Sequence, residues 1–148
     1  MTKIILWAVL IGPLLTLIFL KKETLRRYMP SALFLIVLNT LFYQIAWEYN
    51  WWKEDGVFGW DKVVNIPWNY VAFPVMIIWV LKFTFERFWV YFFVNLGLDI
   101  FFSYIWYPLE FKLGLATGEI KAYQNLLILT FLSLTIYFFQ SWQEGDGF

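Results

Sequence analysis

Asp99 is the residue whose type and position point most directly to chemistry. It lies near the middle of an apolar run over residues 88–107, and a carboxylate at the centre of a membrane helix costs roughly 2.5 to 3.5 kcal/mol on insertion scales. Asn95 and Ser103 stand four residues before and after it, so a helix would present all three side chains on one face. We expect this face to contact other helices. Asp99 is then a proton carrier or, alternatively, a structural hydrogen-bonding partner.

Five more polar residues fall near the ends of apolar runs and would lie at one depth on the predicted outer side of a membrane. They are Glu48, Asn69, Glu110, Gln124 and Asn125. With Asn95 and Asp99 below them, they predict an outward-facing polar vestibule above a buried acid. The alternative for the amides and hydroxyls is hydrogen bonding between helices, worth about 0.6 kcal/mol each. Glu110 extends the Asp99 face only if the helix continues past Pro108, which has no backbone N–H to donate.

The sequence contains no Cys and no His. Disulfides, thiolate catalysis, zinc sites built on Cys or His, and histidine general bases are therefore excluded. Any chemistry must come from carboxylates, amides, hydroxyls, Lys or Arg, and we expect no metal site and no cofactor. A formal net charge of zero offers no basic face for phosphates, so we expect no nucleic-acid partner.

Five apolar runs must position these side chains, and 61% of the 148 residues are hydrophobic. A hydrocarbon core of about 30 Å takes about 20 helical residues, and only helices or closed barrels satisfy their backbone hydrogen bonds there. The runs are continuous, whereas barrel strands alternate apolar and polar residues. We therefore predict an all-α integral membrane protein, one domain over residues 1–148, formed by a bundle of five transmembrane helices. The predicted spans cover residues 4–20, 31–47, 67–83, 88–107 and 122–142.

Basic residues gather in the first connection between the apolar runs. Four fall within a short stretch, at Lys21, Lys22, Arg26 and Arg27. Because Lys and Arg next to membrane spans stay on the cytoplasmic side, we expect this loop inside. With five spans, the N-terminus is then outside and the C-terminus in the cytoplasm. The predicted location is the cell (plasma) membrane, which the chain crosses several times.

Half of the ten tryptophans lie in or beside the second connection, residues 48–66. They are Trp47, Trp51, Trp52, Trp60 and Trp68. Tryptophan rings prefer the headgroup level of a bilayer, so these residues predict an interfacial aromatic rim. One interpretation is a membrane anchor. The other is a lid whose rings fold over a pocket, with Gly56 and Gly59 permitting tight turns.

The third run contains a short motif from Asn69 to Pro74, with Trp79 downstream. It resembles the Asp-Tyr-x-x-Phe-Pro motif and downstream Trp of a family of small uncharacterised helical membrane proteins from spore-forming relatives of Bacillus. Glu110 and residues 120–123 are similar to the end of that family's sequences, while Asn69 stands where the family more often has an acid. The resemblance implies a small bacterial helical membrane protein, and no activity follows from it.

These features favour a small polytopic protein that binds a lipid, a small amphiphile or a partner protein in an aromatic-walled pocket with a buried acid. Two alternatives stay open. One is an enzyme that uses carboxylate acid chemistry on an isoprenoid or lipid substrate, with Asp99 as proton donor and Glu48 or Glu110 stabilising a cation. The other is a small proton-coupled transporter, which with five spans would have to assemble as a homo-oligomer.

Overall fold

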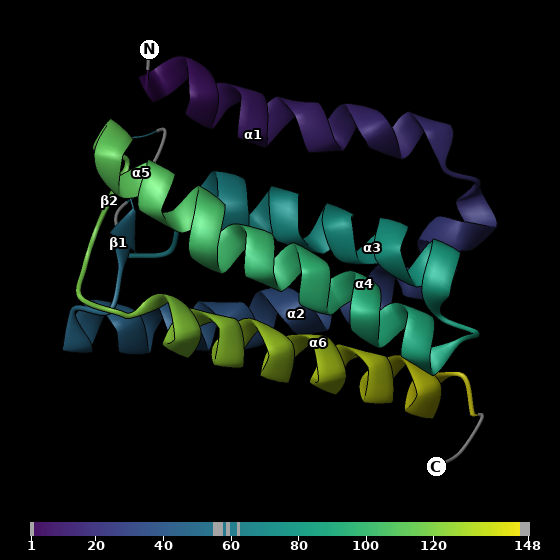
Figure 1. Ribbon diagram of the computed structural model, residues 1–148. Coiled ribbons are helices and arrows are strands. Elements are labelled where there is room, and N and C mark those ends of the chain that lie inside the picture. Colours follow the sequence, from purple (N-terminus) through teal and green to yellow (C-terminus); the bar gives the residue numbers. More distant parts are fainter. Residues whose placement is uncertain (1, 55–57, 59, 62, 146–148) are drawn as a thin grey trace.

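A computed structural model gives the fold and describes residues 2–54, 58, 60, 61 and 63–145. The described chain is mostly helical. Its α-helices are α1 (Thr2–Thr16), α2 (Lys22–Tyr49), α3 (Phe73–Thr84), α4 (Phe88–Phe101), α5 (Tyr107–Leu113) and α6 (Ala122–Gln143). A short 3-10 turn, η1 (Leu17–Phe19), follows α1. The long helices lie side by side in one bundle, which α1 enters at one end and α6 leaves at the other (Figure 1).

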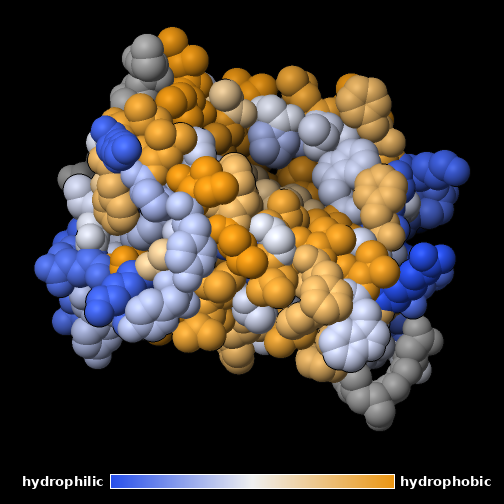
Figure 2. Space-filling view, viewed as in Figure 1, coloured by the Kyte–Doolittle hydropathy of each residue, from blue (hydrophilic) through white to orange (hydrophobic). Residues whose placement is uncertain are grey.

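Four helical segments are long and apolar enough to cross a membrane. They are Lys22–Tyr49, Ile66–Thr84, Phe88–Leu113 and Ala122–Gln143, and a shorter apolar helix covers Ile4–Phe19. The predicted all-α fold is confirmed, and four helices have the length and composition expected of a membrane protein. Apolar residues also cover the middle of the face seen in Figure 2, with hydrophilic residues gathered at its two ends.

Two of the long segments change their hydrogen-bond register shortly before a proline. The π-helical turn η2 (Ile66–Ala72) ends two residues before Pro74, and the π-helical turn η3 (Phe102–Trp106) ends two residues before Pro108. A proline inside an α-helix removes one hydrogen bond and crowds the carbonyl four residues back. A π-turn is a known way to change the register within a continuous helix.

The register change is visible in two backbone hydrogen bonds. The N–H of Phe73 donates to the carbonyl of Trp68, and the N–H of Tyr107 donates to that of Phe102. Each bond spans five residues instead of the four of an α-helix. The helix therefore continues past Pro108, and Glu110 stands on the same helical segment as Asp99.

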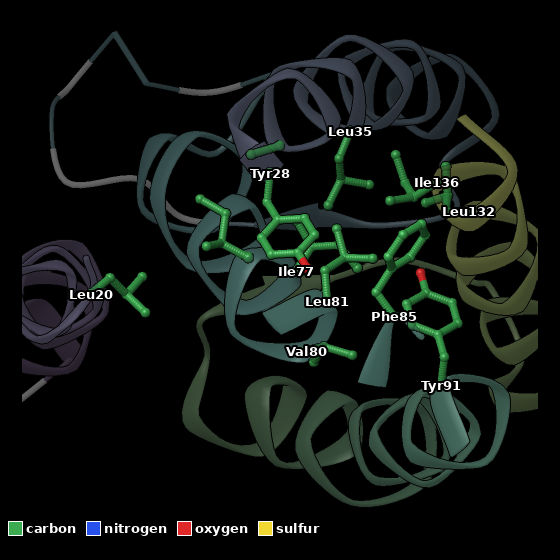
Figure 3. Close-up of a cluster of buried hydrophobic side chains, with 12 residues drawn as sticks. Leu20, Tyr28, Leu35, Ile77, Val80, Leu81, Phe85, Tyr91, Leu132 and Ile136 are labelled. Carbon is green, nitrogen blue, oxygen red and sulfur yellow. The ribbon is translucent and has the colours of Figure 1, made fainter. Parts of the chain in front are cut away.

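The largest apolar cluster packs α2, α3, α4 and α6 together. Its buried members are Leu20, Tyr28, Ala32, Leu35, Ile77, Ile78, Val80, Leu81, Phe85, Tyr91, Leu132 and Ile136. Figure 3 shows the side chains of α2, α3, α4 and α6 in this cluster directed toward one another. This cluster fills the half of the bundle that contains the start of α2 and the end of α6.

A two-stranded ladder holds together two connections at the other end of the bundle. β1 (Lys53–Glu54) pairs antiparallel with β2 (Ala116–Thr117), and the N–H of Ile120 donates to the carbonyl of Trp51 at 3.0 Å. Gly118 permits this close approach. Its φ is 149°, and a Cβ at this position would lie 2.2 Å from the carbonyl oxygen of Trp51. The ladder fixes the position of Glu54 against the helices.

Candidate functional site

Two carboxyl groups from distant parts of the chain meet beside the ladder. Glu54 comes from β1 and Glu110 from α5, and their side chains are hydrogen-bonded to each other. The hydroxyl of Tyr43, on α2, donates to Oε1 of Glu54 at 2.6 Å. An ionised carboxylate has only acceptor atoms, so a hydrogen bond between the two groups requires a proton on one of them. We call these two residues the acid pair. With one proton it carries one negative charge.

No cation compensates this charge within the described part of the chain. The ion pair found there joins Arg27 to Glu144, with 2.8 Å between Nη2 and Oε1, at the opposite end of the bundle. Burial raises the pKa of Glu54 above its ordinary value of 4.5, and the carboxylate of Asp61 raises it further. The hydrogen bonds with Glu110 and Tyr43 act in the opposite direction but are smaller than the effect of burial.

The acid pair lines a cavity of about 50 Å³, which we call the acid cavity. Aromatic side chains from several elements form much of its wall: Tyr43, Trp52, Trp68, Trp106 and Tyr107. Tyr43 and Trp52 meet edge to face with their ring centroids 5.8 Å apart, and the centroids of Trp68 and Trp106 are 5.6 Å apart. A space of this size holds a few water molecules or a chemical group of similar size.

Three polar atoms at the acid cavity are buried without a hydrogen-bond partner in the described structure. They are Oε2 of Glu110, Nε1 of Trp106 and Nδ2 of Asn39. The indole N–H of Trp106 lies beside the Glu110 carboxyl and makes no hydrogen bond. Leaving a buried donor or acceptor unsatisfied costs about 1 to 3 kcal/mol. A polar ligand in the cavity would therefore gain hydrogen bonds that the protein does not make by itself.

Asp99 lines a second cavity of about 50 Å³, further along α4. The hydroxyl of Ser133, on α6, lies 3.5 Å from Oδ2 of Asp99 and 3.3 Å from Oδ1 of Asn95. The Asn95 amide also donates to the carbonyl of Tyr91 at 2.8 Å. The second cavity and the acid cavity share part of their lining, including Asn39 and Phe102. The structure thus brings Asp99 and Asn95 together against α6.

Two other predicted site residues form a hydrogen bond between helices. Ser103 is fully buried, and Nδ2 of Asn125 donates to its hydroxyl at 3.2 Å. Asn125 also lines the acid cavity. Asn69 is fully buried elsewhere, where its amide donates to the hydroxyl of Thr40 at 2.8 Å, and it lies outside the lining of both cavities.

The remaining polar residues of the predicted site are exposed. Glu48 stands on the outer surface of α2. Gln124 is also exposed, and its side chain accepts a hydrogen bond from the N–H of Lys121 at 3.0 Å, which caps the first turn of α6. The structure does not bring either residue to the cavities that contain Glu110 and Asp99.

The tryptophans of the predicted rim divide into two groups. Trp52 and Trp68 are 7% and 8% exposed and line the acid cavity. The other three lie outside it: Trp47 faces Nζ of Lys53, Trp51 stacks on Tyr49, and Trp60 is 73% exposed and stacks on Phe58. Gly56 and Gly59, which the lid interpretation invoked, lie outside the described residues.

Sequence reasoning did not select Glu54 or Ser133 as site residues. Ser133 follows Asn125 by eight residues, a spacing that places both near one face of a helix, so its position could have been found. Glu54 has no such signal, because it lies in a loop with other charged residues. Its contact with Glu110 depends on the pairing of β1 with β2.

An apolar groove of about 810 Å³ lies next to these cavities, between α1 and the η2–α3 segment. Its lining consists of Ile4, Ile5, Ala8, Val9, Pro13, Thr16, Trp68, Ala72, Val75, Met76, Trp79 and Phe102. Trp68 and Phe102 also line the acid cavity. These two residues therefore form a wall common to an apolar groove and to the cavity that contains the acid pair.

No family model, curated protein or solved structure matches this chain. Within the described residues, no group of three or more Asp or Glu side chains is arranged to hold a metal ion. The chemistry of the site must therefore be argued from its own residues. It can hold a proton between two carboxyl groups, accept hydrogen bonds from a small polar group, and place that group beside an apolar groove.

Proposed function

We propose that this protein binds an amphiphile from the membrane. The polar end of the amphiphile reaches the acid cavity, and its chain lies in the groove between α1 and α3. The observation that carries the proposal is the common wall of Trp68 and Phe102, which joins an acidic cavity to an apolar groove. A movement of these two rings would join both spaces into one site for a molecule with a polar end and an apolar end.

The size and lining of the groove support this proposal. Ligand sites for small molecules usually enclose about 300 to 1,000 Å³ and are mostly apolar, with a few polar groups that set orientation. The groove has about 810 Å³, and the acid cavity is smaller, at about 50 Å³. An apolar groove of this volume suits one alkyl or isoprenoid chain.

The proposal includes α1 as a fifth membrane span. With η1, α1 is about 28 Å long at 1.5 Å per α-helical residue and 2.0 Å per 3-10 residue, close to the thickness of the hydrocarbon core. It packs mainly against η2, with fewer contacts to α3. In this arrangement the groove opens within the bilayer, the N-terminus is outside and the C-terminus is cytoplasmic.

Photolabelling tests the proposal. Dodecanol that carries a diazirine would be added to the full-length protein in maltoside detergent, irradiated, and the labelled peptides identified by mass spectrometry. We expect label on α1 and on the η2–α3 segment. Ala8→Trp should fill the groove and reduce that labelling several-fold, because Ala8 lines it.

The matched control is Leu127→Trp, which adds the same ring at an exposed position of α6. It should leave the labelling of α1 and α3 unchanged. Label spread evenly over all lipid-facing helices, with no effect of Ala8→Trp, would contradict the proposal.

A further inference from the structure

The acid cavity contains two carboxyl groups without a cationic partner, and this restricts what it can bind. When the acid pair keeps only the shared proton it carries one negative charge, and no Lys or Arg of the described chain pairs with it. A buried charge without a partner is costly, and the cost is removed when a cation lies beside it. The ligand that best completes this site therefore carries one positive charge.

The wall of the acid cavity favours an organic cation over a metal ion. Hard metal ions such as Mg²⁺ and Ca²⁺ take six or more oxygen ligands, whereas this wall consists largely of aromatic rings. The faces of Trp and Tyr rings attract ammonium groups, and aromatic cages are a common site for them. The acid pair and the rings thus select the same class of ligand by two independent interactions.

Hydrogen bonding defines the ammonium group further. A primary ammonium has three N–H donors, whereas a trimethylammonium group has none. The buried Oε2 of Glu110 has no hydrogen-bond partner and can accept one of these donors. A primary ammonium therefore gains a hydrogen bond that a trimethylammonium group cannot make.

We propose that the bound amphiphile is a primary amine, with its ammonium group between Glu54 and Glu110 and its chain in the groove beside Trp68 and Phe102. This inference rests on the proposed function, since it names the head of the molecule whose chain the groove holds. In this complex the acid pair is in its singly protonated form, so that one ammonium neutralises its one negative charge.

Four probes added to the full-length protein in maltoside detergent test this inference. Dodecylamine, dodecanol and dodecyltrimethylammonium share one chain and differ in the head, and ammonium chloride supplies the head without a chain. Binding is measured by native mass spectrometry and by competition with the diazirine-bearing dodecanol. We expect dodecylamine to bind at least about tenfold more tightly than dodecanol and dodecyltrimethylammonium, and ammonium chloride not to compete.

Variants test the contribution of the head group to binding separately from that of the alkyl chain. Glu54→Gln combined with Glu110→Gln removes the charge but keeps the shape of both side chains, so the preference for dodecylamine over dodecanol should disappear while dodecanol still binds. Glu119→Gln removes an exposed carboxylate near the same loop and should keep the preference. The comparison of probes on the unmodified protein needs no variant, so a folding defect in the double variant leaves the test intact.

The outcomes distinguish the two proposals. Equal binding of dodecylamine and dodecanol, both prevented by Ala8→Trp, would overturn the ammonium site and leave the amphiphile site standing. Equal binding of dodecyltrimethylammonium and dodecylamine would contradict the hydrogen-bonding argument and overturn the choice of a primary amine. Failure of every alkyl probe to bind would overturn the proposed function together with this inference.

Discussion

Glu54 connects the charge of the site to the stability of the protein. Burial raises the pKa of its carboxyl, so the folded state favours the protonated form more than the unfolded state does. A group of this kind stabilises the fold below its unfolded pKa, and that contribution is lost as pH rises through the raised folded pKa. The contribution of Glu54 to the stability of the folded state is therefore largest on the acidic side of neutrality.

The first prediction follows from the upward direction of this pKa shift. We expect the melting temperature of the purified protein to fall as pH rises from about 4.5, and to fall less in Glu54→Gln, which cannot ionise. For a chain of this size, 1 kcal/mol corresponds to about 2 to 4 °C in melting temperature. The measurement is a thermal melt at a series of pH values in one neutral detergent. Glu119→Gln serves as control and should follow the unmodified protein, and an identical slope in Glu54→Gln would refute the prediction.

At this scale, the sequence revealed the acids that lie within or at the ends of apolar runs and missed the one in the middle of a polar loop. Asp99 and Glu110 could be selected because placing a carboxylate in or beside hydrocarbon costs free energy, so such a residue is a candidate for a function. Glu54 could not, because charged residues are ordinary in a loop. Its enclosure results from contacts with residues far away in the sequence, at Tyr43 and Glu110.

At the scale of the elements, hydropathy located the helices but not their full lengths. The predicted second span starts at residue 31, whereas α2 starts at Lys22. The additional turns are polar and lie outside the predicted apolar run, so hydropathy alone does not identify them as part of the helix. The continuation of the helix past Pro108 was left open, because the π-turn before this proline is a feature of backbone register that side-chain type does not reveal.

The second prediction concerns the contact that joins the two loops. Gly118→Ala places a Cβ 2.2 Å from the carbonyl oxygen of Trp51, at a backbone φ of 149° that L-residues rarely adopt. We expect this substitution to separate β2 from β1 and to expose Glu54 to water. A cysteine introduced in place of Glu54 should then react faster with a water-soluble maleimide in the Gly118→Ala background than without it.

Gly97→Ala provides the matched control, because Gly97 has open space around its Cβ position and lies on α4 away from the loops. It should leave the cysteine reactivity unchanged, and alanine in place of glycine favours a helix by up to about 1 kcal/mol. Equal reactivity in both backgrounds would show that the ladder does not control access to the acid pair.

The whole molecule has its acid pair at one end and its basic cluster at the other. The third prediction is that the end with Glu54 faces outward and the end with Lys21 and Arg27 faces the cytoplasm. Since the native chain has no cysteine, single cysteines report the orientation. A cysteine in place of Glu119 should react with an impermeant maleimide in intact cells, whereas one in place of Glu23 should react only after permeabilisation. Both positions are exposed, so burial does not explain a difference, and the reverse pattern would invert the orientation.

The two loops joined by the ladder are made at different times. Glu54 leaves the ribosome while Glu110 and β2 have not yet been synthesised, because they come from the second half of the chain. Until then Glu54 lacks both the carboxyl of Glu110 and the strand that pairs with β1. The enclosure of Glu54 therefore requires residues from both halves of the chain, and it is complete only after the second half has been made.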